Sequence, residues 1–175
     1  MREDYTRVTS ILYPFTDLDK IPPHILKKAA DRGTKVHEIC EGIIAGIGEH
    51  GVDEETRGYV DSFIQWWSKG HKVVEMEKRF WCDDLKITGQ CDLIIDTGDG
   101  LAIVDLKTSS KESDTWHPQG CAYAYLARQA GYDIQKIMFI HLFKDGREAK
   151  VIEYPVDIGF FFAIFKTYLH FYHKD

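Results

Sequence analysis

Paired cysteines are missing from this sequence, because its four cysteines, Cys40, Cys82, Cys91 and Cys121, stand singly, without Cys-x-x-Cys spacing. Single cysteines predict neither a zinc site nor an iron–sulfur cluster, so we expect buried free thiols. No stretch approaches the roughly 20 consecutive apolar residues of a membrane-spanning helix. The first residues lack the apolar core of a secretory signal. These absences predict a cytoplasmic protein without an iron–sulfur cluster or a membrane segment.

A surplus of basic residues is also lacking, since the formal net charge is −6 at pH 7. Nucleic-acid binding normally calls for a basic surface that neutralises phosphates, so this charge disfavours a general nucleic-acid binder. It does not exclude a nuclease, which gathers acids at its centre and guides the strand with a local basic rim. The length of 175 residues, without repeats or linkers, predicts one domain over residues 1–175.

The order of the predicted elements favours an α/β fold with a helical N-terminal third. Apolar stripes of helical period and helix start and stop residues indicate helices, and alternating patterns separated by turns indicate strands. The predicted helices cover residues 22–30, 33–47, 53–67, 116–130 and 158–172. The predicted strands cover residues 71–81, 89–96, 101–109, 136–143 and 150–154.

Two acids and a lysine fall on the hairpin formed by the second and third predicted strands. If Asp96 faces Leu101 across the turn, Asp92 sits opposite Asp105. Opposed Cβ atoms lie only about 4.5–5.5 Å apart, so two like charges there destabilise the pair unless a cation lies between them. Lys107 is two residues beyond Asp105 and therefore leans over the same spot. This layout is typical of a metal-dependent phosphodiesterase.

The alternative is that Asp92 and Asp105 are ordinary acids facing solvent. Opposed carboxylates on an otherwise apolar hairpin destabilise the fold unless they have a partner, which favours the interpretation as a metal site. Carboxylate oxygens suit hard cations such as Mg²⁺ or Mn²⁺, so one or two of these ions are the expected cofactor. The charge of Lys107 would then favour a metal-bound hydroxide or stabilise the pentacovalent transition state, and both roles stay open.

Four motifs are spaced along the chain: RGTKVHE at residues 32–38, GQCD at 89–92, VDLKT at 104–108 and QGCAY at 119–123. In this order they resemble the PD-(D/E)XK nuclease superfamily, specifically its RecB-like exonuclease branch. The likeness is greatest to mitochondrial genome maintenance exonuclease and short phage exonucleases. The resemblance implies a restriction-endonuclease-like core, in which helices flank a mixed central sheet of about five strands.

The resemblance also implies a metal site. It assigns ligand roles to His37, Asp92, Asp105 and the backbone carbonyl of Leu106. His37 taken alone is better explained as a core histidine on an apolar helix face. An imidazole among the ligands would tolerate Mn²⁺ better than a purely carboxylate cage would.

Further residues are candidates for binding DNA or completing the site. Gln119 and Tyr123 are spaced i and i+4 and so share one helix face, where the family holds the DNA strand. Arg32, Lys35 and Lys111 flank the motifs and either contact phosphates or form a solvated face. Trp116 stacks on a base or anchors the start of its helix. Glu77 and Glu41 are weaker candidates, since a wet strand face and a surface position explain them as well.

These features predict an exonuclease that hydrolyses phosphodiester bonds of single-stranded DNA with a free end. By resemblance it would serve DNA replication, recombination or repair in a bacterial or phage-infected cell. An endonuclease of the same superfamily is the main alternative. A non-catalytic DNA-binding protein on the same fold is disfavoured, because no binding role demands the crowded pair Asp92 and Asp105 with Lys107.

Overall fold

A six-stranded mixed sheet forms the centre of the structure, a computed structural model that describes residues 4–172. The strands are β1 (Thr6–Arg7), β2 (Lys72–Cys82), β3 (Ile87–Asp96), β4 (Leu101–Lys107), β5 (Ile134–His141) and β6 (Lys150–Pro155). The main path runs β1-β3-β4-β5-β6, and β2 pairs with β3. The pairs β1–β3 and β4–β5 are parallel, and the others are antiparallel. The predicted α/β class with a mixed sheet of about five strands is confirmed.

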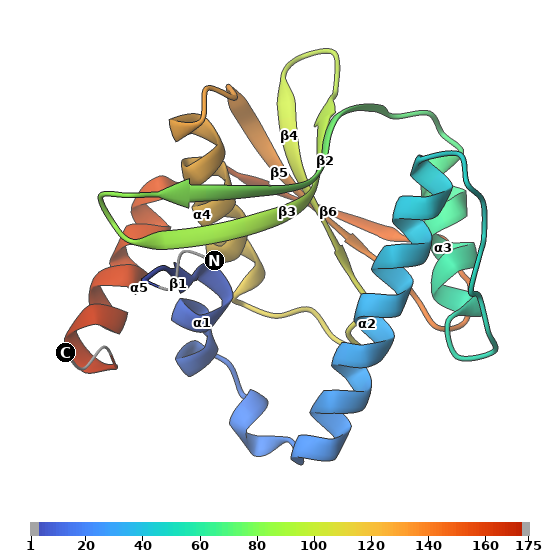
Figure 1. Cartoon of the computed structure of the whole chain (residues 1–175), viewed down its shortest axis with the longest axis horizontal. Coiled ribbons are helices and arrows are strands. Elements are labelled where there is room, and N and C mark those ends of the chain that lie inside the picture. The colour runs from blue at the N-terminus through green and yellow to red at the C-terminus, as the bar shows by residue number, and fades with distance from the viewer. Residues whose placement is uncertain (1–3, 173–175) are drawn as a thin grey trace.

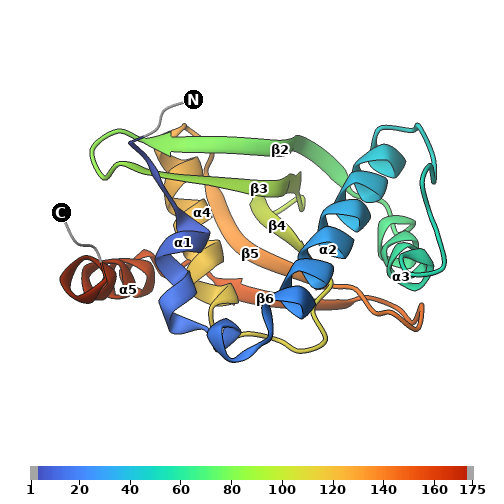
Figure 2. The same ribbon diagram turned by 60° about the horizontal axis from the view of Figure 1, so that its bottom comes forward.

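Helices cover both faces of this sheet (Figures 1 and 2). They are α1 (Val8–Leu12), α2 (Pro23–Ile44), α3 (Arg57–Trp67), α4 (Trp116–Gln129) and α5 (Ile158–Phe171), with 3-10 turns η1 (Tyr13–Phe15) and η2 (Leu18–Lys20). One apolar core lies between the sheet and α1, α4 and α5, and the other lies between the sheet and α2 and α3. Within residues 4–172, none of the helices has the length and apolar character needed to cross a membrane.

The N-terminal third differs from its prediction in three places. The two helices predicted over residues 22–30 and 33–47 form one helix, α2, which passes through Gly33 without a break. An added Cβ on Gly33 would lie 3.4 Å from Oγ1 of Thr108, which is ordinary van der Waals contact, so packing does not demand a glycine there. Helix α3 begins at Arg57 rather than Asp53, because the Asp53 carboxylate accepts hydrogen bonds from the Thr56 amide and hydroxyl and forms a turn. The elements β1 and α1 were not predicted.

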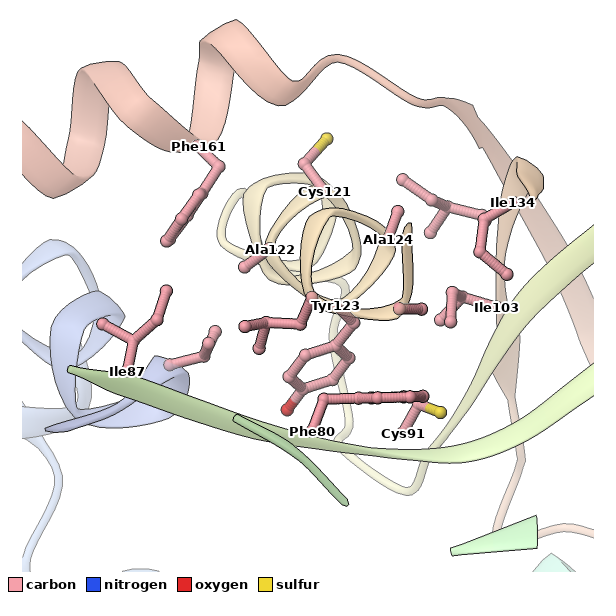
Figure 3. Close-up of a cluster of buried hydrophobic side chains, with 14 of the residues drawn as sticks. Phe80, Ile87, Cys91, Ile103, Cys121, Ala122, Tyr123, Ala124, Ile134 and Phe161 are labelled. Atoms are coloured by element: carbon pink, nitrogen blue, oxygen red, sulfur yellow. The ribbon is translucent and has the colours of Figure 1, made fainter. Parts of the chain in front are cut away.

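Helix α4 packs closely on the sheet and thereby places the residues of the QGCAY motif. Figure 3 shows Tyr123 of α4 beside Phe80 and Cys91 of the sheet, with Phe161 of α5 on the opposite side of the helix. Gly89 permits this approach, because a Cβ there would lie 2.7 Å from the Tyr123 ring. The glycine of the GQCD motif is therefore explained by packing against α4.

Strand β3 opens beside the site. One of its edges pairs with β2, and the other pairs with β1 at Ile87 and Thr88 and with β4 only from residue 93 onward. Residues 89–92 thus lie in a gap between β1 and β4. The predicted register of the hairpin is confirmed from the Asp96–Leu101 pair to residues 93 and 104. Asp92 and Asp105 lie one step beyond the last pair of the ladder, Leu93 with Val104, and the amide of Leu106 donates to the Asp92 carboxylate instead of continuing the ladder.

Candidate active site

Helix α2 carries His37 to the gap, because Val36 and Cys40 of the same helix are buried against the sheet. Nδ1 of His37 lies 3.2 Å from Oδ1 of Asp92, and Nε2 lies 3.1 Å from the carbonyl oxygen of Leu106. Burial disfavours the charged imidazole, but the Asp92 carboxylate outweighs burial and raises the pKa of His37 to about 9. His37 therefore joins β3 to the end of β4.

Two carboxylates with opposite pKa shifts lie at the centre of the site, Asp105 buried and the Asp92 side chain 13% exposed. Oδ2 of Asp92 accepts a hydrogen bond of 2.6 Å from the amide of Leu106. Burial opposes ionisation of Asp92, but His37 and the Leu106 amide outweigh it and lower its pKa. Burial raises the pKa of Asp105 against the attraction of Lys107, and the charge of Asp92 raises it further. The two acids therefore repel each other, as expected where a cation binds.

Lys107 is held in one position by two contacts. Its Nζ lies 2.6 Å from Oδ2 of Asp105 and 3.0 Å from Oε1 of Gln119. Phe139 lies beneath it, with the ring centroid 5.3 Å from Nζ. Only 18% of the Lys107 side chain is exposed, so the ammonium is largely withdrawn from bulk water. The lysine is thus a positive charge fixed beside the two acids.

Gln119 and Tyr123 project from one face of α4, as their i and i+4 spacing predicted. Nε2 of Gln119 donates to the Tyr123 hydroxyl at 2.9 Å, while Oε1 accepts from Lys107. Both side chains are buried. Burial, with the charge of Asp105, raises the pKa of Tyr123, so its hydroxyl stays protonated at neutral pH. The two residues form a short chain of hydrogen bonds that ends on Lys107.

Glu77 of β2 lies closer to the centre than its sequence context suggests. One potential ligand atom from each of Glu77, His37 and Asp92 lies within 4.8 Å of the others. Burial and the charge of Asp92 raise the pKa of Glu77 to about 7, although the Gln90 amide donates to its carboxylate. Gln90 also accepts from Arg79, so a further polar pair that sequence reasoning missed supports Glu77.

The position of Glu77 follows from the strand register and its backbone conformation. Lys78 pairs with Cys91 in the β2–β3 ladder, which places Glu77 beside Asp92 across the two strands. Glu77 also has a φ of +50°, in the left-handed region that residues other than glycine rarely adopt. A sequence pattern does not reveal this conformation, so the prediction ranked Glu77 low.

The donor set fits a divalent cation. His37, Glu77 and Asp92 offer one nitrogen and two carboxylates within a single small volume, and Asp105 lies nearby. The mutual repulsion of the carboxylates is the kind of charge imbalance that a bound cation relieves. Oxygen donors suit Mg²⁺ and Mn²⁺, and an imidazole is better matched to Mn²⁺. The carboxylate of Asp105 pairs with the ammonium of Lys107 and is not part of the cluster of these three residues.

Two of the three basic residues predicted to bind substrate, Arg32 and Lys35, lie on α2. Nη2 of Arg32 donates to the carbonyl oxygen of Thr108 at 3.3 Å, and its guanidinium lies 5.2 Å from the ring centroid of Tyr59. Nζ of Lys35 lies 2.5 Å from Oδ2 of Asp53 on an exposed surface. Arg32 thus ties α2 to the end of β4, and Lys35 remains accessible to solvent.

The other predicted residues are distributed around the site. Lys111 is exposed on the loop after β4, and Glu41 is half-buried on α2, where its charge contributes to the raised pKa of Glu77. Trp116 is 4% exposed, and its ring stacks on Phe139 with centroids 5.5 Å apart. The Trp116 ring therefore anchors the start of α4, which is one of the two roles predicted for it.

The fold and the site together define a class of protein: nucleases that place acids and a lysine on one hairpin of a mixed sheet. A model of the PD-(D/E)XK nuclease superfamily matches residues 23–157. The chain belongs to this superfamily, as its four motifs predicted.

Solved structures of exonucleases share the fold. An alkaline exonuclease from Laribacter hongkongensis, LHK-Exo, is similar with a TM-score of 0.53 and 12% identity, over 97% of this chain and 88% of that chain. A candidate exonuclease from Eubacterium rectale is similar with a TM-score of 0.58 and 14% identity, over 94% of this chain and 77% of that chain. At these identities the likeness concerns the fold. No curated protein matches the sequence.

Proposed function

We propose that this protein is a metal-dependent deoxyribonuclease that removes nucleotides from a free end of single-stranded DNA. One observation carries the proposal: the ammonium of Lys107 is fixed 2.6 Å from Asp105, beside the cluster of His37, Glu77 and Asp92. A lysine withdrawn from bulk water next to crowded carboxylates unites a positive charge for the phosphate with a site for a cation. This combination is what phosphodiester hydrolysis requires.

The residues divide the work between them. His37, Glu77 and Asp92 would hold Mg²⁺ or Mn²⁺, with Asp105 and the carbonyl of Leu106 as further ligands. When bound, the metal supplies an activated water and neutralises charge on the phosphate. Lys107 places its ammonium where negative charge develops. Gln119 orients Lys107, and the buried hydroxyl of Tyr123 holds the amide of Gln119 in that orientation.

The site and its surroundings offer a path for a DNA strand. The cation cluster lines a hollow of about 280 Å³ that Arg79 and Tyr123 also border. This hollow would receive the part of the strand that carries the scissile phosphate. Arg32, Lys35 and Lys111 would contact phosphates along the approach. The two similar solved structures are described as exonucleases, which supports attack at a free end.

A comparison of linear and circular DNA tests the proposal. The purified protein is incubated with 5′-labelled linear, 3′-labelled linear and closed circular single-stranded DNA of the same sequence, with Mg²⁺, with Mn²⁺ and with EDTA. We expect metal-dependent loss of the linear strands and survival of the circle. Rapid cutting of the circle would identify an endonuclease instead. Binding of DNA without cleavage under every metal condition would identify a non-catalytic DNA-binding protein.

A further inference from the structure

A second, larger cavity opens on the other side of Lys107. It has a volume of about 660 Å³ and lies between the N-terminal segment, from α1 through η2, and the loop of residues 108–115 that joins β4 to α4. Figure 2 shows this loop and the N-terminal segment running along the same edge of the molecule. Sequence patterns gave no sign of the cavity, because its two walls are about 90 residues apart in the chain.

The walls of the cavity combine apolar and hydroxyl groups. Tyr13, Leu18 and Ile21 contribute apolar surface, although they are 49%, 37% and 37% exposed, respectively. Buried Leu12 and Trp116 contribute to the same wall. Serine and threonine hydroxyls from the loop line the opposite side. Exposed apolar side chains that gather around one cavity suit a ligand with flat apolar faces and polar edges.

The cavity is continuous with the catalytic residues. Lys107 and Gln119 belong to its lining, whereas Tyr123, the hydrogen-bond partner of Gln119, lines the hollow that contains the cation cluster. Thr9 lines both. A phosphate at Lys107 would therefore have the cation cluster on one side and this cavity on the other.

Charges in the cavity wall are compatible with a nucleotide. Asp17 is paired with Lys20 at 2.5 Å, and Glu112 is paired with Lys150 at 2.5 Å, so two of the acids in the lining are already neutralised. Lys111 adds a cation at the rim. Asp114 is the third acid of the lining. A nucleobase is uncharged, so these acids do not repel it.

We propose that this cavity binds the nucleobase of the nucleotide next to the scissile phosphate, with the exposed ring of Tyr13 as its stacking surface. The proposal rests on the proposed nuclease function and adds a base-binding site to it. Stacking on an aromatic ring tolerates any base, because every base has a π-face. The cavity therefore positions the reacting phosphate without imposing a sequence preference.

Cleavage of abasic substrates by Tyr13 variants tests the stacking. Single-stranded oligonucleotides carry one abasic nucleotide at the first or second position from either end, and kcat/KM is measured for each with Mn²⁺. Tyr13→Ala is expected to lower kcat/KM on the intact strand by about 5- to 150-fold. Tyr13→Phe keeps the ring and is expected to restore most of this loss. Phe171→Ala removes an exposed ring outside the cavity, 66% exposed against 49% for Tyr13, and serves as the control.

The abasic strand identifies the contact itself. At the one position where its base would enter the cavity, an abasic nucleotide is expected to lower kcat/KM of the unaltered protein and to abolish the effect of Tyr13→Ala. Equal kcat/KM for unaltered protein and Tyr13→Ala on the intact strand would overturn the base-binding site. It would leave the nuclease function standing.

A binding measurement separates the base-binding site from catalysis. The base analogue 2-aminopurine, placed near the end of the strand, loses fluorescence when it stacks on a ring, and this is recorded with Asp92→Asn to prevent turnover. Quenching that Tyr13→Ala abolishes supports the cavity, even if the unaltered protein cleaves no DNA and the nuclease proposal fails. Unchanged quenching in the Tyr13→Ala, Asp92→Asn double variant overturns the cavity.

Discussion

Oε1 of Gln119 lies 3.0 Å from Nζ of Lys107, while Nε2 of the same amide donates to the hydroxyl of Tyr123. An ammonium can only donate hydrogen bonds, so the amide oxygen must face Lys107, and the Tyr123 hydroxyl accepts from the other end. Gln119 is 8% exposed and has little freedom to turn over. This explains in physical terms why a glutamine and a tyrosine stand one helical turn apart in the QGCAY motif.

Removal of Gln119 is expected to impair catalysis more than binding. A hydrogen bond to a charged group contributes about 1.5–3 kcal/mol, so Gln119→Ala should lower kcat by about 10- to 150-fold. KM should change little, since the amide acts through Lys107. Gln129→Ala on the exposed end of the same helix is the matched control. A rise in KM at constant kcat would show that Gln119 binds the strand directly.

Divalent cations should stabilise the fold through the cluster of His37, Glu77 and Asp92. A cation at 100 times its Kd stabilises the native state by about 2.7 kcal/mol, which raises Tm by roughly 5–10 °C in a protein of this size. Glu77→Gln should reduce the rise in Tm that Mn²⁺ produces. In EDTA the same substitution should not lower Tm, because it removes one of the crowded negative charges. Exposed Glu38 on α2 provides the control, Glu38→Gln. Equal Mn²⁺ shifts in the two variants would exclude Glu77 as a ligand.

Glycines that look alike in the sequence should respond oppositely to alanine. A Cβ on Gly58 would overlap the backbone carbonyl of Lys144, which cannot move aside as a side chain could. Overpacking of this kind costs about 1–3 kcal/mol, so Gly58→Ala should lower Tm by several degrees. Gly33→Ala meets only ordinary contact with Thr108 and gains helix propensity, so Tm should hold or rise. Thermal denaturation followed by circular dichroism checks both, and equal losses would contradict the packing of α3 on the loop at Lys144.

The thiols should be inert in the native protein. All four cysteines are free and buried. Burial raises the pKa of Cys121 to about 11 and also raises the pKa of Cys40 and Cys91, so few thiolates exist at pH 8. An aromatic disulfide reagent is expected to react slowly with the folded protein. After denaturation it is expected to react with all four thiols. Fast reaction of the folded protein would contradict the burial.

The hairpin could be predicted in detail because local chemistry determines it. Its turn contains two glycines in positive φ, Gly98 and Gly100, and the register follows from that turn as far as residues 93 and 104. The spacing of Asp105 and Lys107 follows from the two-residue repeat of a strand. The position of Lys107 beside Asp105 could therefore be predicted from the sequence.

Other features depend on contacts that no local pattern encodes. The two-residue strand β1 exists only because it meets β3 at Ile87 and Thr88. The gap between β1 and β4 has a similar origin. Strands β1, β2 and β4 all pair with β3, and β1 and β4 share one of its edges without meeting. Gly33 was predicted to start a helix, whereas it lies inside α2, whose residues Val36, Ile39 and Cys40 are buried. These elements are therefore determined by long-range packing and not by local residue propensities.

The most direct test of the account is hydrolysis of end-labelled single-stranded DNA by the unaltered protein and by Lys107→Met, each with Mn²⁺ and with EDTA. The account predicts metal-dependent release of nucleotides by the unaltered protein and a loss of at least about 100-fold in Lys107→Met. Circular dichroism of Lys107→Met should show an intact fold. Undiminished cleavage by Lys107→Met, or cleavage by the unaltered protein in EDTA, would contradict it.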